Sequence, residues 1–198
     1  MTTEGLTGPA EDTSGRRPVV LGIAGSPRRH GNSEQMLDAC LGGVVEAGIT
    51  PCRGCNACSL TGECVVRDGM RDVYPRLDAA DAIVVASPVF FATVPAVLKM
   101  LYDRCQPYWA RRYVLKEPVR GKRPGGMLVA RGGGDPFGHE CATATTRSVF
   151  AVLRVSYDAE HVVAGVDSPG DIGRHPDALS RAREIGAELA RAAAAARR

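Results

Sequence analysis

Four apolar, β-branched runs alternate along this chain with segments of helical periodicity, and this alternation limits its possible folds more than any other feature. The runs are Pro18–Ala24, Asp81–Ser87, Gly126–Ala130 and Ala159–Val166, and the expected helices are about Ser33–Ala47, Arg71–Ala80, Pro95–Arg104, His139–Leu153 and Pro176–Ala195. Unbroken apolar strands separated by helices are typical of a parallel sheet that is covered on both faces. The chain is therefore predicted to be an α/β protein with three layers, α/β/α.

The length of the chain, 198 residues, fits one domain with a sizeable hydrophobic core. Residues 18–198 are expected to form that domain, and residues 1–17 to be a disordered tail. No run approaches the roughly 20 apolar residues of a membrane span, and residues 1–17 lack the apolar core of a signal peptide. The net charge of +3 is too small to indicate nucleic acid or a membrane as partner. We therefore expect a cytoplasmic protein, whose thiols stay reduced.

Four cysteines, Cys52, Cys55, Cys58 and Cys64, lie in a predicted loop that spans residues 51–65. Their spacing, C-x2-C-x2-C-x5-C, allows the thiolates to point at a common centre, and the tight intervals suit a [4Fe–4S] cluster. Two alternatives stay open. In a zinc site, two C-x2-C pairs that share a central cysteine would strain a tetrahedral geometry. Otherwise the cysteines only pack the loop or form redox-labile disulfides.

A loop that opens the first helix, Gly25–Ser33, has the composition of an anion site. Ligands of such sheets bind beyond the carboxyl ends of the strands, where this loop is expected. Small and hydroxyl residues let backbone N–H groups face an anion at the positive end of a helix, and Arg28 can add charge-assisted bonds. Asn32 is expected to be the N-cap of the helix, with Gln35 three residues on. The loop matches neither G-x-G-x-x-G nor a Walker loop.

Two further loops follow the next strands. Ser87–Pro95 combines aromatic and hydroxyl groups directly after a buried strand, which suits one face of a planar ring. Arg131–Asp135 contains three consecutive glycines, whose missing side chains let the backbone approach a flat ligand. Three such loops on successive strands indicate one shared ligand site.

These segments resemble one family. Gly25–Ser33 is similar to the phosphate-binding loop of the NADPH-dependent FMN reductase family of flavodoxin-like proteins. Ser87–Phe91 and Lys99–Arg104 resemble that family's S-P-V-Y-F loop and following helix. The cysteine stretch with the trailing Asp68-Gly69-Met70 resembles the iron–sulfur flavoproteins within the family. The resemblance runs from about Val19 to Val166.

The resemblance implies a flavodoxin-like fold that binds FMN non-covalently. The implied phosphate residues are Ser26, Arg28, Asn32 and Ser33, with Pro27 and Gly31 in the same loop. The implied neighbours of the isoalloxazine are Ser87, Pro88, Val89, Phe90 and Phe91, with Gly132 and Gly133 near its far edge.

The chain departs from the family pattern between the first helix and Cys52. Only residues 48–51 stand where the family has its second strand and a loop, which is too short for both. We expect the second, edge strand of the sheet to be shortened or missing. Because the cysteine loop follows that strand position, we also expect it at the carboxyl edge, on the FMN side.

The predicted function is that of an FMN-dependent oxidoreductase with a [4Fe–4S] cluster, which passes electrons from ferredoxin or NAD(P)H to a small acceptor. The alternatives are a cluster-free NAD(P)H-dependent FMN, quinone or nitro reductase, and a non-enzymatic flavodoxin-like carrier. A carrier is expected to be strongly acidic, which the net charge argues against. No residue is assigned as a general acid or base. Aromatic residues at Tyr108, Trp109 and Tyr113 predict a homodimer or homotetramer.

Overall fold

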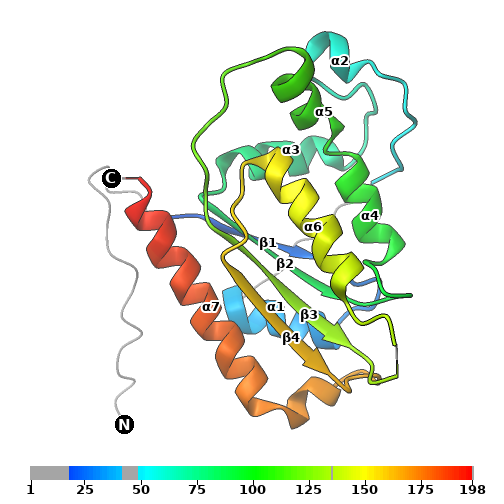
Figure 1. The fold of residues 1–198 in the computed structure, drawn as a ribbon, viewed down its shortest axis with the longest axis vertical. Helices are drawn as coiled ribbons and strands as arrows, with labels where there is room; N and C mark the ends of the chain where they lie inside the picture. The colour runs from blue at the N-terminus through cyan, green and yellow to red at the C-terminus, as the bar shows by residue number, and fades with distance from the viewer. Residues whose placement is uncertain (1–17, 42–48, 135, 198) are drawn as a thin grey trace.

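The computed structural model describes residues 18–41, 49–134 and 136–197, which contain a parallel sheet of four strands in the order β1-β2-β3-β4 (Figure 1). The strands are β1 (Val20–Ala24), β2 (Ala82–Pro88), β3 (Gly125–Arg131) and β4 (Ala159–Ala164). Each lies where an apolar run predicts it, within two residues at either end. Within the described ranges β1 is an edge strand, in agreement with the expectation that the family's second strand is shortened or missing.

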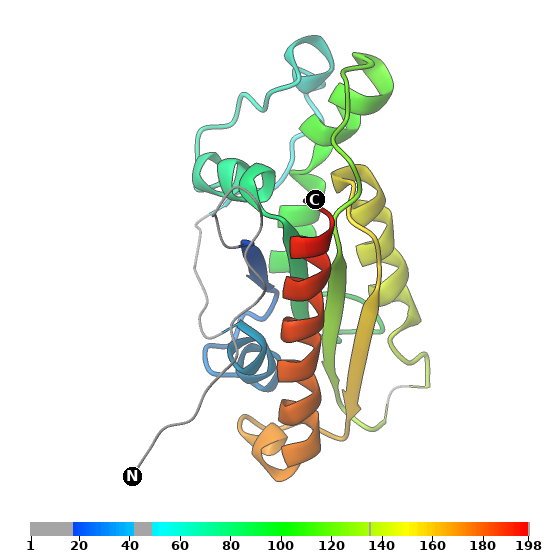
Figure 2. The ribbon, with the colours of Figure 1, turned by 90° about the vertical axis from the view of Figure 1, so that its left-hand side faces the viewer.

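Helices cover both faces of the sheet, so the predicted three layers are confirmed (Figure 2). The helices on one face are α1 (Asn32–Leu41) and α7 (Pro176–Ala195), and those on the other are α3 (Met70–Ala79), α4 (Ala96–Asp103) and α6 (Glu140–Leu153). Alternate residues of β2 point to opposite layers: Ile83 and Val85 pack with α3, α4 and α6, whereas Val84 and Ala86 pack with α1 and α7. The expected continuation of α1 over residues 42–47, and the tail 1–17, lie outside the described residues.

Close packing of α7 on α1 depends on a glycine. A Cβ atom at Gly186 would lie 2.2 Å from the carbonyl oxygen of Cys40, so only glycine lets the two helices approach this closely.

Among the described helices, none is both long enough and apolar enough to cross a bilayer.

Four short elements were not predicted, because each is too short to show a periodicity. They are α2 (Cys58–Thr61), α5 (Gln106–Trp109), the π-helical turn η1 (Ala110–Val114) and the 3-10 turn η2 (Asp171–Arg174). The first three lie together at the end of the molecule beyond α4 (Figure 1). Arg111 ties η1 to the cysteine loop, which contains α2, since its Nε donates to the carbonyl of Gly62 over 2.8 Å.

A buried arginine that precedes β3 joins the ends of two helices. Arg123 donates from Nη1 to the carbonyls of Leu77 and Ala80, the latter at 2.7 Å, and from Nη2 to the carbonyl of Leu153 at 3.2 Å. These carbonyls belong to the carboxyl ends of α3 and α6, where the helix dipoles favour a cation. Burial, together with the charge of Arg120, lowers the pKa of Arg123 to about 10, so the guanidinium still carries its charge at neutral pH.

We expect Arg123→Met to destabilise the fold strongly. It would leave buried carbonyls without donors, at about 1–3 kcal/mol for each, so the free energy of unfolding should fall by roughly 3 kcal/mol or more. The matched control is Arg120→Met: Arg120 is exposed and donates to the carbonyl of Asp78 at 2.6 Å, and its loss should cost about 1 kcal/mol or less. Urea unfolding of both variants measures the difference, and equal losses would contradict the assignment.

Candidate functional site

Loops at the carboxyl ends of the strands enclose a cavity of about 160 Å³. The predicted residues that line it come from all three loops: Ser26, Arg28, Gly31, Asn32, Ser33, Pro88, Val89, Phe90 and Gly132. The other predicted residues do not line it. Ser87 is buried and its hydroxyl donates to the carbonyl of Pro88, while Pro27, Phe91 and Gly133 are exposed. The three loops therefore do form one site, with a smaller lining than predicted.

The anion loop ends at the amino terminus of α1. The first N–H groups of a helix have no partner within the helix, and they lie at the positive end of its dipole. The Ser26 hydroxyl accepts the N–H of Arg28 at 3.0 Å and so shapes the turn that leads to this end. Exposed Arg28 lies on the rim of the cavity, where it can add a charge-assisted bond to an anion.

The prediction that Asn32 caps α1 is wrong. Asn32 lies within the first turn of the helix, and its buried side chain points to the loop after β4. Its Nδ2 donates to the carbonyls of Val166 and Ser168 at 3.2 and 3.0 Å, and its Oδ1 accepts the N–H of Ile172 at 3.1 Å. Because these bonds use both N–H donors of the amide, only the backbone N–H of Asn32 is available to an anion.

The second loop contains a strained turn. Phe90 and Thr93 exchange backbone bonds of 2.9 and 3.2 Å, and the two residues between them, Phe91 and Ala92, have φ angles of 51° and 64°. Two central residues at positive φ define a type I′ turn, which glycine or asparagine normally occupies. The turn presents the ring of Phe91 to solvent at 99% exposure, beside Phe90 on the cavity wall. Strain of this kind is typical of functional loops.

A fourth loop contributes residues that were not predicted. Val166, Asp167 and Pro169, which follow β4, line the same cavity. The Asp167 carboxylate occupies space beside Gly132: a Cβ atom on that glycine would lie 2.2 Å from its Oδ1. The sequence offered one signal for this loop, namely its position after the carboxyl end of a predicted strand, where ligands of such sheets bind.

The four clustered cysteines line a second cavity, of about 410 Å³, together with Asp103, Arg104, Gln106, Pro107 and Trp109. These neighbours lie at the carboxyl end of α4 and directly after it. The predicted position at the carboxyl edge of the sheet is therefore wrong, because α4 starts after the Phe90 loop and runs back along the sheet (Figure 1). Phe90 lines the cavity that precedes α4, and Asp103 lines the cavity at its carboxyl end, so the two cavities lie at opposite ends of this helix. The eight residues of α4 span about 12 Å, and this length separates the two ends of the helix at which the cavities lie.

The thiols of the second cavity influence one another. Burial raises the pKa of Cys58, and the charges of Cys64, Cys52 and Cys55 raise it further, whereas a backbone hydrogen bond opposes the shift. In the described part of the chain, no three His, Cys, Asp or Glu side chains are gathered closely enough to hold a single metal ion. Zinc requires such a gathering, with sulfur at about 2.3 Å from one ion. In a cubane cluster each thiolate binds a different iron, so cysteines spread around a cavity fit the cluster better.

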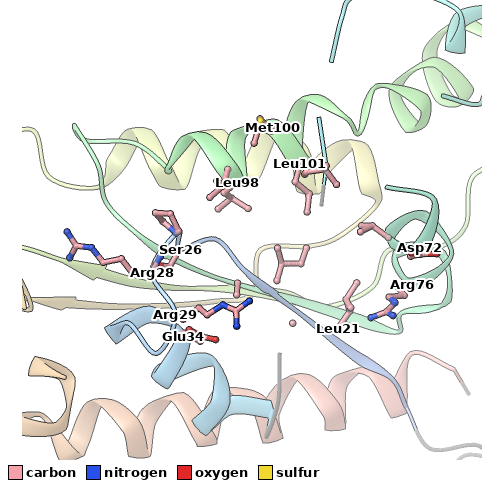
Figure 3. Close-up of a pocket in the computed structure, with 17 residues that line it drawn as sticks. Leu21, Ser26, Arg28, Arg29, Glu34, Asp72, Arg76, Leu98, Met100 and Leu101 are labelled. Carbon is pink, nitrogen blue, oxygen red and sulfur yellow. The ribbon is translucent and has the colours of Figure 1, made fainter. Parts of the chain in front are cut away.

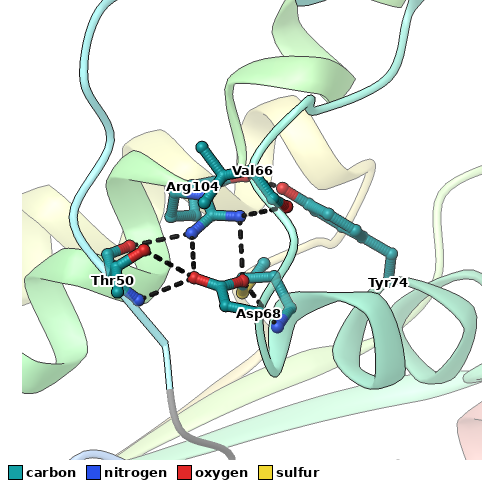
Figure 4. Close-up of polar contacts among 6 residues, drawn as sticks. Thr50, Val66, Asp68, Tyr74 and Arg104 are labelled. Carbon is teal, nitrogen blue, oxygen red and sulfur yellow. Dashed lines mark hydrogen bonds and ion pairs between the residues drawn. The ribbon is translucent and has the colours of Figure 1, made fainter.

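A buried ion pair anchors the cysteine loop (Figure 4). Arg104 Nη1 lies 2.6 Å from Asp68 Oδ2, and Nη2 lies 3.1 Å from Oδ1, a bidentate pair. The hydrogen bond from Arg104 holds the pKa of Asp68 well below its usual range despite burial, with help from Thr50. The Tyr74 hydroxyl donates to the Arg104 carbonyl at 2.7 Å. Removing one partner of such a buried pair typically costs about 3–5 kcal/mol.

A third cavity, of about 540 Å³, follows the edge of β1 (Figure 3). It lies where the family has its second strand, between Leu21 of β1 and Leu98 and Leu101 of α4. Arg76 and Asp72 face it from α3. Its lining mixes leucines with charges of both signs, which favours no single class of ligand.

The aromatic residues that follow α4 are only partly exposed. Tyr108 was expected in an interface, but its ring packs against the core and its hydroxyl donates to the carbonyl of Tyr74 at 3.3 Å. Trp109 and Tyr113 are each 42% exposed, and their ring centroids lie 5.9 Å apart. A surface aromatic pair therefore exists, without Tyr108.

Comparison with known proteins agrees with this geometry. Residues 18–165 match the family described as NADPH-dependent FMN reductase. The chain is 33% identical over 187 residues to an iron-sulfur flavoprotein of Archaeoglobus fulgidus, covering 87% of this chain and 79% of that protein. It is 31% identical over 190 residues to one of Methanocaldococcus jannaschii, covering 86% and 95%. A flavodoxin, WrbA-like protein from Agrobacterium tumefaciens has the same fold, with a TM-score of 0.59 at 15% identity over 90% of this chain and 98% of that one.

Proposed function

Because this chain belongs to the NADPH-dependent FMN reductase family, and within it to the iron–sulfur flavoproteins, we propose that it passes electrons through a [4Fe–4S] cluster and FMN to a small acceptor. It is a flavin-dependent oxidoreductase. The donor in this proposal is ferredoxin or NAD(P)H, and the reducing cytoplasm is the compartment that suits its reduced cysteines. The observation that carries the proposal is the single cavity lined by Cys52, Cys55, Cys58 and Cys64.

FMN would be held at the carboxyl edge of the sheet. The backbone at the start of α1, with Ser26 and Arg28, would bind its phosphate, and Pro88, Val89 and Phe90 offer an apolar surface for its ring. The Asp167 carboxylate repels phosphate but accepts hydrogen bonds from hydroxyl groups, so it suits the ribityl chain. When bound, FMN supplies one- and two-electron chemistry, and the chain supplies its position and the exclusion of water.

We expect Cys55→Ser to separate the two cofactors. The variant should lose iron and the broad absorbance beyond the flavin bands, yet keep FMN, because the FMN loops come from other segments. Reduction by ferredoxin should slow sharply, whereas hydride transfer from NAD(P)H should be spared.

Iron analysis, visible spectra and stopped-flow reduction of anaerobically purified protein measure these effects. The matched control is Cys141→Ser, at an exposed cysteine that does not line the cavity. A wild-type protein without iron, or unchanged rates in Cys55→Ser with both donors, would favour the cluster-free reductase instead.

Arg28→Ala should weaken FMN binding without unfolding the sheet. The loss of a charge-assisted bond of about 1.5–3 kcal/mol corresponds to roughly a ten- to hundredfold weaker affinity. Arg29→Ala is the control, since Arg29 does not line the smaller cavity. Titration of each apoprotein with FMN gives the affinities, and wild-type affinity in Arg28→Ala would refute the phosphate assignment.

A homodimer or homotetramer is also proposed, with the exposed pair Trp109 and Tyr113 in the interface. Half-exposed aromatic groups are enriched in interfaces, and Arg112 stacks over the Tyr113 ring at 4.8 Å. Sedimentation equilibrium at micromolar concentration should give a multiple of 20.9 kDa, and Tyr113→Glu should shift it toward that value. A wild-type monomer would contradict the assembly.

A further inference from the structure

Both ends of the cysteine loop meet at one guanidinium group. Arg104 Nη1 donates to the carbonyl of Thr50 at 2.8 Å, on the amino side of the loop. On the carboxyl side, the same group forms the bidentate pair with Asp68 and a long contact of 3.5 Å to the carbonyl of Val66. Thr50 also binds Asp68 directly, through its N–H at 2.8 Å and its hydroxyl at 2.7 Å. All four clustered cysteines therefore lie within a segment that Arg104 closes (Figure 4).

One donor of Arg104 is left over. The side chain is fully buried, and its Nε–H has no hydrogen-bond partner in the described part of the chain. Buried donors without a partner are rare, and each requires an explanation. Arg104 lines the same cavity as the four cysteines, so a group that fills this cavity can supply the missing acceptor. The sulfur atoms of a thiolate-bound cluster are acceptors of this kind.

We propose that Arg104 is a positioning residue for the cluster: its terminal nitrogens close the cysteine loop, and its Nε–H donates to a sulfur of the bound cluster or of its ligands. This inference rests on the proposed function and deepens it. Hydrogen bonds to sulfur are one of the protein's means of setting the reduction potential of a cluster, which a neighbouring cation makes more positive. The side chain thus links the geometry of the loop to the redox potential.

Lysine does not reproduce this arrangement. Arginine carries five donors in a planar fork, so it can bind a carboxylate with two nitrogens and still direct a third elsewhere. A lysine at position 104 would keep the charge next to Asp68 but bring all its donors to one atom. Arg104→Lys therefore removes the Nε–H, while Asp68→Asn breaks the ion pair and keeps that donor.

The first experiment measures how firmly the holoprotein holds its iron. For Arg104→Lys and Asp68→Asn we expect retention to weaken by about 10–100-fold, as for other groups that orient metal ligands, measured as iron released to a ferrous chelator. FMN content should stay at the wild-type level. The control is Lys99→Gln, which breaks an exposed 2.7 Å pair with Asp103 on the same helix and should behave as wild type. Equal iron release from Arg104→Lys and Lys99→Gln would overturn the proposal.

The second experiment separates the donor from the loop closure. An anaerobic redox titration followed by electron paramagnetic resonance gives the midpoint potential of the clusters that remain. This potential should be more negative in Arg104→Lys, and equal to or more positive than wild type in Asp68→Asn, which keeps the Nε–H and removes a nearby negative charge. A wild-type potential in Arg104→Lys would overturn the donor role.

Trypsin digestion of iron-free protein tests the closure without the cluster. Arg53 and Arg67 are exposed cleavage sites between Thr50 and Asp68. Cleavage there should be at least about tenfold faster in Arg104→Lys than in wild type, because the closed state loses charge-assisted bonds. Equal cleavage rates would overturn the closure. A wild-type protein that never contains iron would overturn the proposed function and the donor role, while this digestion would still decide whether Arg104 closes the loop.

Discussion

Parallel pairing of the four strands is the constraint on which the rest of the molecule depends. Neighbouring parallel strands require a connection that returns over one face of the sheet, so every loop that leaves a strand lies at one edge and every helix carries the chain back to the other. The FMN loops therefore share a cavity, although they are far apart in sequence. The same constraint moves the cysteine cavity to the opposite end of α4.

Two buried arginines hold segments that apolar packing leaves unsupported. Arg104 has a carboxylate partner, whereas Arg123 donates from its two terminal nitrogens to carbonyls at two helix ends, where the aligned peptide dipoles act as a partial negative charge. In the described residues the cysteine loop lacks a preceding strand to anchor it, and the Arg104–Asp68 pair takes over that role. These two guanidinium groups can be buried because their terminal nitrogens have carboxylate or carbonyl partners within hydrogen-bond distance.

Local patterns predicted the loops well and the individual side chains less well. Ser26, Arg28 and Phe90 were found from composition and position, and they do line one cavity. Asn32 was assigned to the wrong partner, because capping is a local rule whereas its amide bonds a loop more than 130 residues away. Asp167 was missed for the same reason: nothing near it in the sequence marks it as a neighbour of Gly132.

The sequence by itself determined the four described strands, their parallel arrangement, the expectation of a shortened or missing second strand and the spacing of the cysteines, because all of these depend on periodicity and on separations along the chain. Only the tertiary structure decided which end of the molecule holds the cysteines, which aromatic residues are exposed, and that Arg104 meets Asp68. The Lys99–Arg104 and Asp68–Met70 motifs can each be recognised in the sequence, but the contact between Arg104 and Asp68 cannot. This ion pair forms because the fold brings the two side chains together, and their separation along the chain does not predict the contact.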